Sequence, residues 1–184
     1  IIDKSIDLIG ENKDSTIIDS GGTGDVIYVS ADLVNISEFT IQNCGSKWFD
    51  GGIELISNNS NIFNNKIILN NYAGIRMWKS SNNTIYANNF EQNSFVSVWL
   101  LGGCLNNEIN DNEIINNNIG IKLENGSNNN IIKQNNISNN SALYSLQSTT
   151  YHVQHALQVH NNISNHSVLY SNFTIMCSMH TSCN

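Results

Sequence analysis

An asparagine-anchored motif recurs four times in the middle of the chain at a nearly constant spacing. It reads [Ser/Asn]-x-Ile-x-x-Asn-x-[Ile/Phe]-x-x-Asn, and its four copies begin at Ser60, Asn83, Asn107 and Asn130. The first apolar positions of successive copies, Ile62, Ile85, Ile109 and Ile132, are 23, 24 and 23 residues apart. A fixed period in this range is typical of a solenoid, in which each repeat stacks on the last.

The apolar residues within a repeat form short alternating pairs, such as Ile75-x-Met77 and Ile121-x-Leu123. Runs this short favour strands, and none of them extends into a helical face. Three short strands joined by turns would make one coil, and coils would stack at the spacing of hydrogen-bonded strands, about 4.8 Å. The sequence therefore predicts an all-β solenoid of about six coils, each about 22–24 residues long.

The repeated asparagines, part of a total of 35 among 184 residues, have an expected structural role in turns. Asparagine tolerates left-handed backbone conformations, and its amide can bond the nearby backbone. Stacked in register, the same side chains can bond one another as a ladder. A glycine precedes the next strand in Gly52-Ile53-Glu54-Leu55 and its counterparts at Gly74 and Gly120, where it would permit a tight corner.

Earlier coils are recognisable but diverged. The segment from Val34 to Cys44 fits the motif with apolar residues or cysteine at the asparagine positions, which places Cys44 in a turn ladder. Upstream, Ile6-x-Leu8 and Ile17-Ile18 suggest part of a first coil. The chain opens inside a strand pattern with neither Met nor signal peptide, so we expect a fragment or a processed chain.

Over residues 5–140 this pattern resembles the right-handed parallel β-helix repeat family, with its pectin-lyase-like architecture. It is most similar to the surface or secreted proteins whose domain is named after the NosD periplasmic copper-pathway protein, the carbohydrate-binding and sugar-hydrolase (CASH) group. The resemblance implies a single-stranded right-handed parallel β-helix. The family includes lyases, hydrolases, epimerases, adhesins and structural proteins, so function has to be argued from a site.

Composition excludes some classes of function. The net charge is −7 with only eight Lys and Arg residues, which argues against nucleic acid, because its binding needs a basic face. No stretch approaches the roughly 18 apolar residues of a membrane span. The family resemblance implies an extracellular, cell-surface or periplasmic module that is part of a larger surface protein.

Stacking the Gly-Ile-x-Leu segments predicts which residues face solvent, because alternate strand positions point to opposite faces. One predicted outward column contains Tyr28, Glu54, Arg76, Ser97 and Lys122. The neighbouring column contains Ser30, Ile56, Trp78, Trp99 and Glu124. An exposed Trp78–Trp99 pair beside Arg76 and Glu54 would suit the flat faces of sugar rings and predicts polysaccharide or glycan binding. The alternative is a Trp stack that shields the strands, with Glu54 and Arg76 as an ordinary cross-strand ion pair.

Catalysis on the same face is a second hypothesis. Polysaccharide lyases and epimerases of the family suggest basic residues acting on a uronate, for which Arg76, Lys79 and Lys122 are the candidates. Carboxylates for acid, base or ligand roles would come from Asp50, Glu54 and Glu124. Glycoside hydrolysis needs two carboxyl groups about 5–10 Å apart, and Glu54 and Glu124 are predicted to lie three coils apart, at the far limit.

The repeat pattern deteriorates after Asn140, which divides the chain into β-helix repeats at 1–140 and a degenerate last coil, cap or irregular tail at 141–184. The tail holds residues that suit copper or zinc: His152, His155, His160, Met176, Cys177, Met179, His180 and Cys183. Oxygen ligands for calcium occur at Glu108, Asn110, Asp111 and Glu113. Alternation splits that second group between two faces, so a solvated turn explains it better. A copper-related, NosD-like role is a further alternative to the predicted polysaccharide-binding or scaffolding module.

Overall fold

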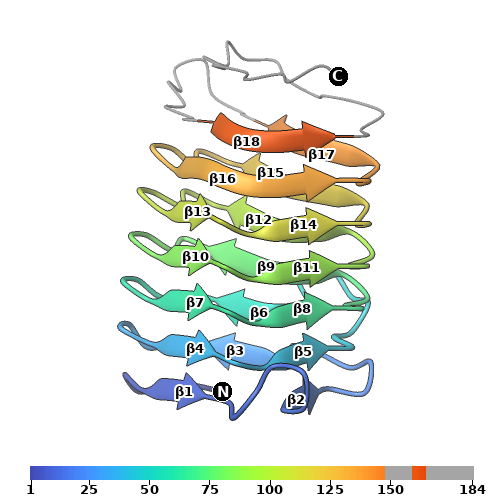
Figure 1. The fold of residues 1–184 in the computed structure, drawn as a ribbon. Helices are drawn as coiled ribbons and strands as arrows, with labels where there is room; N and C mark the ends of the chain where they lie inside the picture. The colour runs from blue at the N-terminus through green and yellow to red at the C-terminus, as the bar shows by residue number, and fades with distance from the viewer. Residues whose placement is uncertain (148–158, 165–184) are drawn as a thin grey trace.

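The computed structural model describes residues 1–147 and 159–164, which form parallel β-strands wound into a solenoid (Figure 1). Each coil passes through three strands, for example β7 (Asn61–Phe63), β8 (Lys66–Ile68) and β9 (Ala73–Trp78). The strands of successive coils pair in parallel, as β7 does with β10 (Thr84–Tyr86). The predicted all-β parallel fold with three strands per coil is confirmed.

The strands form three stacks, one along each side of the coils. The first stack contains β1 (Asp7–Ile9), β4 (Asn35–Ser37), β7, β10, β13 (Glu108–Asn110) and the start of β16 (Ile131–Ser138). The second contains β2 (Ile17–Asp19), β5 (Thr40–Gln42), β8, β11 (Asn89–Glu91), β14 (Glu113–Ile115) and the end of β16. The third is a separate six-stranded sheet of β3 (Ile27–Val29), β6 (Gly51–Leu55), β9, β12 (Val96–Leu101), β15 (Ile119–Glu124) and β17 (Ala142–Gln147).

The long strand β16 turns the corner without a break and joins the first two stacks into one 12-stranded sheet, which also includes β18 (Val159–Ser164). The six-stranded sheet takes one strand from each coil. About five complete turns therefore separate β3 from β17, slightly fewer than the six coils predicted. No helix long and apolar enough to cross a lipid bilayer occurs in the part of the chain that the structure describes.

Identical positions of successive coils stack into columns of aliphatic side chains that form the core. The first column of the motif is fully buried and contains Ile36, Ile62, Ile85, Ile109 and Ile132. Two further columns contain Ile41, Ile67, Phe90, Ile114 and Ile137, and Ile53, Ile75, Val98 and Ile121. Each such side chain contributes about 1.5–3 kcal/mol of hydrophobic stabilisation. The core is continuous from coil to coil, as the period predicts.

Three ladders of buried side chains run along the corners, and they confirm the predicted asparagine ladder. Asn88 shows the pattern: its Oδ1 accepts from the backbone N–H and the Nδ2 of Asn65, at 3.0 and 3.1 Å. Its own Nδ2 donates to the backbone carbonyls of Ile62 and Tyr86, at 2.8 and 3.0 Å. The ladders contain Ser60, Asn83, Asn107 and Asn130; Asn65, Asn88, Asn112 and Asn135; and Asn70, Asn93, Asn117 and Asn140.

The left-handed turn position is not the ladder asparagine but the residue before it. Asn64 and Ala87, for example, have φ of 53° and 54° and directly precede Asn65 and Asn88. The ladder residue is therefore selected for its amide, which bonds in two directions, and not for its tolerance of positive φ. That part of the predicted turn role is wrong, and it explains why the preceding position accepts other residue types.

Cys44 occupies the ladder position expected for it, because its backbone N–H donates to Asn70 Oδ1 at 3.1 Å. A fourth corner ladder, not predicted from the sequence, includes Ser57, Ser80, Cys104 and Ser127. Cys44 and Cys104 are free and buried. Burial raises the pKa of the Cys44 thiol to about 11, so this cysteine is a structural residue with little thiolate at neutral pH.

The strands beyond residue 140 continue the stack. β17 pairs with β15 and β18 pairs with β16, both in parallel. Whether residues 141–184 form a separate cap or tail, as the sequence predicts, stays a prediction.

Candidate functional site

The outer side of the six-stranded sheet carries a second hydrophobic cluster, separate from the core. Arg76, Trp78 and Trp99 alternate with core residues along β9 and β12, so they point away from the solenoid interior. We call the aromatic residues gathered there the outer aromatic cluster: Trp48, Phe49, Tyr72, Trp78, Phe95 and Trp99. The strands of all three stacks repeat regularly, but the outer face of the six-stranded sheet differs because it carries this aromatic cluster.

The segment at residues 45–50 folds over this face and supplies two of the aromatic rings. Phe49 packs edge-on against Trp78, and Trp48 against Trp99, with ring centroids 6.3 Å apart in each pair. Gly45 has no room for a side chain, because a Cβ would lie 2.6 Å from the Gly24 backbone nitrogen. The segment remains accessible at its tip, where Trp48 is 66% and Phe49 44% exposed.

The structure places Trp99 differently from the prediction. Trp99 pairs with Arg76 and Lys122 on the neighbouring strands, and Leu101, not Trp99, lies beside Trp78. Trp99 is also 1% exposed, so it is not part of an exposed Trp78–Trp99 column.

The physical reason for this error is a two-residue slip in β12. Val96-x-Val98 and Val98-x-Leu100 are both alternating apolar pairs. In the sheet, Val98 and Leu100 are the residues that pair with Ile75 and Met77. Ser97, predicted to face outward beside Arg76, is buried next to the position of Gly74 instead. There its carbonyl would lie 2.6 Å from a Cβ on Gly74, which explains the recurring glycine at this corner.

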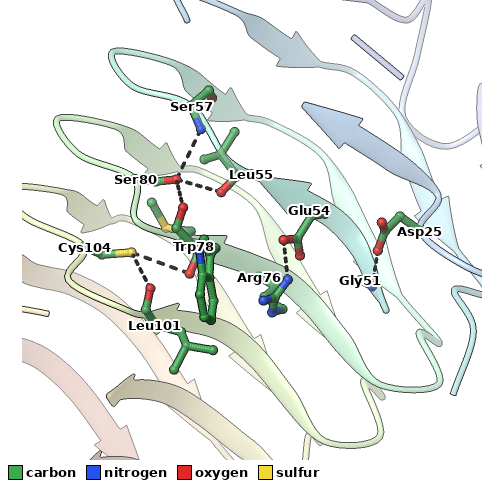
Figure 2. Close-up of polar contacts among 11 residues, drawn as sticks. Asp25, Gly51, Glu54, Leu55, Ser57, Arg76, Trp78, Ser80, Leu101 and Cys104 are labelled. Carbon is green, nitrogen blue, oxygen red and sulfur yellow. Dashed lines mark hydrogen bonds and ion pairs between the residues drawn. The ribbon is translucent and has the colours of Figure 1, made fainter. Parts of the chain in front are cut away.

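Arg76 and Glu54 lie side by side on β9 and β6 and form an ion pair through Arg76 Nη1 and Glu54 Oε1 (Figure 2). This ion pair is one of the two alternatives that the sequence predicts, but the sequence does not predict that both side chains are buried. Arg76 and Glu54 are only 6% and 3% exposed, because the guanidinium lies 4.3 Å from the centre of the Phe49 ring and 5.3 Å from that of Trp78. Burial raises the pKa of Glu54 to about 7, although the Arg76 charge acts in the opposite direction.

A further carboxylate, Asp25, lies within electrostatic reach of this ion pair, and Asp50 lies within reach of Asp25. Asp25 Oδ1 accepts the backbone N–H of Gly51 at 2.8 Å, and burial raises the Asp25 pKa, with Asp50 adding a smaller contribution in the same direction. Asp50 in turn accepts the backbone N–H of Lys47 at 2.9 Å, within the covering segment. The Arg76 guanidinium beneath Phe49 is therefore the cation beside Glu54 and Asp25.

A second charged pair lies on β15, on the other side of β12 from β9. Lys122 Nζ contacts Glu124 Oε1 at 2.9 Å, and Glu124 Oε2 accepts the indole N–H of Trp99 at 2.8 Å. The Lys122 ammonium also lies 4.9 Å from the centre of the Trp99 ring and 5.0 Å from that of Phe95. These contacts hold Trp99 in one orientation between the strands.

The three residues predicted for catalysis are gathered on this face, but two are already paired. Arg76 and Lys122 each have a carboxylate partner, so a uronate would have to displace Glu54 or Glu124. Lys79 lies at the end of β9, with Nζ 5.8 Å from the centre of the Trp78 ring. Glu54 and Glu124 are on β6 and β15, three strands apart in the sheet, as expected.

The predicted metal ligands in the tail, including His152, His155, Cys177, His180 and Cys183, lie outside the described residues. Among the residues that are described, no group of three or more His, Cys, Asp or Glu side chains could hold a metal ion. At the calcium candidate, Glu108 instead contacts Lys133 Nζ at 2.8 Å and accepts from Asn110 Nδ2 at 2.7 Å.

Sequence reasoning missed the contribution of Trp48, Phe49, Tyr72 and Phe95. One signal for the first two was present, because seven residues lie between Cys44 and Gly52 but only three lie between Asn70 and Gly74 at the equivalent corner. An insertion that carries two large aromatic residues into a polar turn is unusual in a repeat, and insertions map to loops on one face of a solenoid.

Comparison with known proteins agrees with this geometry. Residues 10–174 match the family described as "Right handed beta helix region". No curated protein matches the chain.

Proposed function

The chain belongs to the right-handed β-helix family, and we propose that it is a non-catalytic module that binds polysaccharide through the outer aromatic cluster. The fold is compatible with proteins that act on polysaccharides, but a fold of this type hosts many functions, so the proposal rests on the site. The ligand would lie across the outer face of the six-stranded sheet, against the segment at residues 45–50.

The observation that carries the proposal is the exposure of aromatic rings around Trp48. A tryptophan that is 66% exposed, beside a Phe49 that is 44% exposed, is an unusual use of large apolar side chains at a surface. Trp78, half-buried beside them, extends the same surface. Flat rings bordered by polar groups suit the apolar faces of sugar rings and their hydroxyl-bearing edges.

The scaffold beneath these rings is rigid, which favours recognition. β9 and β12 are held on both sides by neighbouring strands and are anchored at their corners by buried ladder side chains. Trp78 is on strand β9, and a binding group placed on a strand loses little conformational freedom when a ligand binds. We assign the module to an extracellular, cell-surface or periplasmic location, as part of a larger surface protein, because polysaccharides of this kind are found there.

Tryptophan fluorescence tests the proposal directly, because all three tryptophans of the chain belong to the outer aromatic cluster. The protein is titrated with neutral and acidic polysaccharides, and the double variant Trp48→Ala/Trp78→Ala is compared by calorimetry. We expect saturable binding that the double variant loses. Tyr86→Ala is the matched control, since Tyr86 stacks on Phe63 on the other sheet, with ring centroids 5.0 Å apart.

Three results would contradict the proposal. Binding that survives the double variant would place the ligand elsewhere, and silence across the whole panel would favour a purely structural coil stack. Release of unsaturated uronates, seen as new absorbance in the near ultraviolet, would show that the face is catalytic.

A further inference from the structure

Two polar atoms of the Glu54–Arg76 pair are buried and unused. Glu54 Oε2 and Arg76 Nε have no hydrogen-bond partner among the residues that the structure describes. Their neighbouring atoms, Glu54 Oε1 and Arg76 Nη1, form the ion pair. Each side chain therefore has one atom in the ion pair and one that has no partner among the described residues. A buried polar atom without a partner costs about 1–3 kcal/mol, and more where the group is charged. Such atoms point to a function.

We propose that these two atoms form a subsite for a hydroxyl group of a neutral sugar, an inference that rests on the polysaccharide-binding function proposed above. A hydroxyl is both a donor and an acceptor, so one group can donate to Glu54 Oε2 and accept from Arg76 Nε–H. It also suits either protonation state of Glu54, because it can accept from the acid as readily as it donates to the carboxylate. The rings of Phe49 and Trp78, which already flank the guanidinium, would cover the sugar's apolar face.

Charge selects a neutral sugar over a uronate. A uronate carboxylate only accepts hydrogen bonds, so it could accept from Arg76 Nε but would have no proton to share with ionised Glu54. Asp25 lies within electrostatic reach of Glu54, and Asp50 of Asp25, whereas Arg76 is the cation that acts on both Glu54 and Asp25. An additional negative charge would therefore be repelled. This subsite differs from the uronate-binding role that the basic residues alone suggest.

Phe49 controls access to the subsite. Both unused atoms are inaccessible to solvent in this structure, and the Phe49 ring lies directly over the guanidinium. Phe49 is on a surface segment, 44% exposed, with a left-handed φ of 89° that a bulky residue rarely adopts. In the proposed subsite, a shift of this one side chain opens the Arg76 guanidinium to the sugar.

The first test uses the unmodified protein, so it does not depend on the folding of a variant. Tetrasaccharides of neutral glucan, mannan and galactan are titrated calorimetrically beside a polygalacturonate tetramer. We expect a neutral tetramer to bind at least about tenfold more tightly than the acidic one. Its monodeoxy analogues then locate the hydroxyl, and removal of that single group should weaken binding about tenfold or more, the usual effect of a hydrogen bond to a charged partner.

The second test uses Glu54→Gln, which keeps the shape of the side chain but changes the acceptor to an amide. We expect it to weaken binding of the neutral tetramer about tenfold and to abolish the difference between the parent sugar and its critical deoxy analogue. Glu108→Gln is the matched control, because Glu108 is also ion-paired, to Lys133, but on the other sheet. Thermal unfolding of both variants shows whether the fold is retained.

The outcomes separate the two proposals. Preferred binding of polygalacturonate, or equal binding of every deoxy analogue, would overturn the hydroxyl subsite and leave the binding function intact. The absence of binding to all tetramers and polymers would overturn both.

Discussion

The corners of the solenoid and the outer face of the six-stranded sheet bury polar groups in opposite ways. At a corner, the amide of Asn88 uses its oxygen and its nitrogen fully and also bonds to the coils on either side. On the outer face, Glu54 and Arg76 are equally buried, but each keeps one polar atom without a partner among the described residues. Repetition gives the ladder side chains partners in the neighbouring coils, whereas the unrepeated ion pair is only partly satisfied.

The difference indicates that the corners stabilise the fold, whereas the outer face has features of a binding surface. The corners provide stability that does not depend on any one coil, since the same contacts recur along the stack. The outer face departs from the repeat at residues 45–50, and there the structure has exposed aromatic rings and buried charges. An incompletely satisfied ion pair beside exposed aromatic rings, on a scaffold held by repeated ladders, is the arrangement expected of a binding surface.

The largest expected effect comes from interrupting a ladder. Asn88→Ala removes the partner of the Asn65 backbone N–H and of the carbonyls of Ile62 and Tyr86. Three buried backbone groups lose a hydrogen bond, so we expect a loss of about 3–5 kcal/mol in the free energy of unfolding, measured by urea titration. The control is Asn89→Ala, one residue along but outside the ladder, which should cost under about 1 kcal/mol. Similar losses for the two variants would contradict the role of the ladder.

Breaking the ion pair should be somewhat less costly than interrupting the ladder. Arg76→Met leaves Glu54 buried without its counter-charge, and we expect a loss of about 3 kcal/mol above neutral pH. The double variant Glu54→Leu/Arg76→Met removes both charges and should recover to within about 1 kcal/mol of the parent protein, because apolar side chains can replace a buried pair. Urea titrations of the two single variants and the double variant complete the cycle. An additive result would mean that the pair contributes nothing beyond its separate side chains.

The pH dependence of the free energy of unfolding tests the burial of Glu54 on the outer face. Glu54 has a folded-state pKa of about 7, raised by burial above its ordinary value of 4.5, so the folded protein binds more protons than the unfolded chain between these values. Its favourable contribution is full below about pH 4.5 and is lost as the pH rises through 7, by an amount on the order of 3 kcal/mol. The raised pKa of Asp25 acts in the same direction.

This dependence is measured as the free energy of unfolding from pH 4.5 to 7.5, for the parent protein and for Glu54→Leu/Arg76→Met. The five histidines are present in both proteins, so their titration cancels in the difference. We expect a steeper decline in the parent protein. Parallel curves would mean that Glu54 does not titrate in this range.

Much of the scaffold could be predicted from the sequence, because its determinants are repeated. The spacing of Ile62, Ile85 and Ile109 gives the strand register of the core, and the stacked asparagines indicate the ladders. Each repeat confirms the alignment of the others. Even Cys44 could be placed in a ladder, since only its position, not its side chain, had to match.

The outer face could be predicted only in part, because its features occur once. Arg76 and Glu54 were placed correctly as neighbours, since both flank conserved positions of the repeat pattern within this chain. Trp99 was misplaced, because β12 contains two overlapping apolar pairs and only the three-dimensional stacking chooses between them. The covering role of Trp48 and Phe49 depends on a loop conformation that no second copy in the sequence could reveal.

The smallest expected effect on stability is at Trp48, and it separates the two regions most clearly. Trp99→Ala should lower the free energy of unfolding by about 3–5 kcal/mol. The wild-type side chain is only 1% exposed, so its removal leaves a cavity, and the hydrogen bond to Glu124 is lost as well. Trp48→Ala changes the same residue type at a position 66% exposed, and we expect a loss below about 1 kcal/mol. Thermal and urea unfolding give both values. If Trp48→Ala lowers stability as much as Trp99→Ala, the Trp48 ring stabilises the fold, and its exposure no longer supports a role in binding. If the loss is small, a large apolar side chain is kept at the surface for a reason other than stability, and the neighbouring aromatic and polar residues support polysaccharide recognition as that reason.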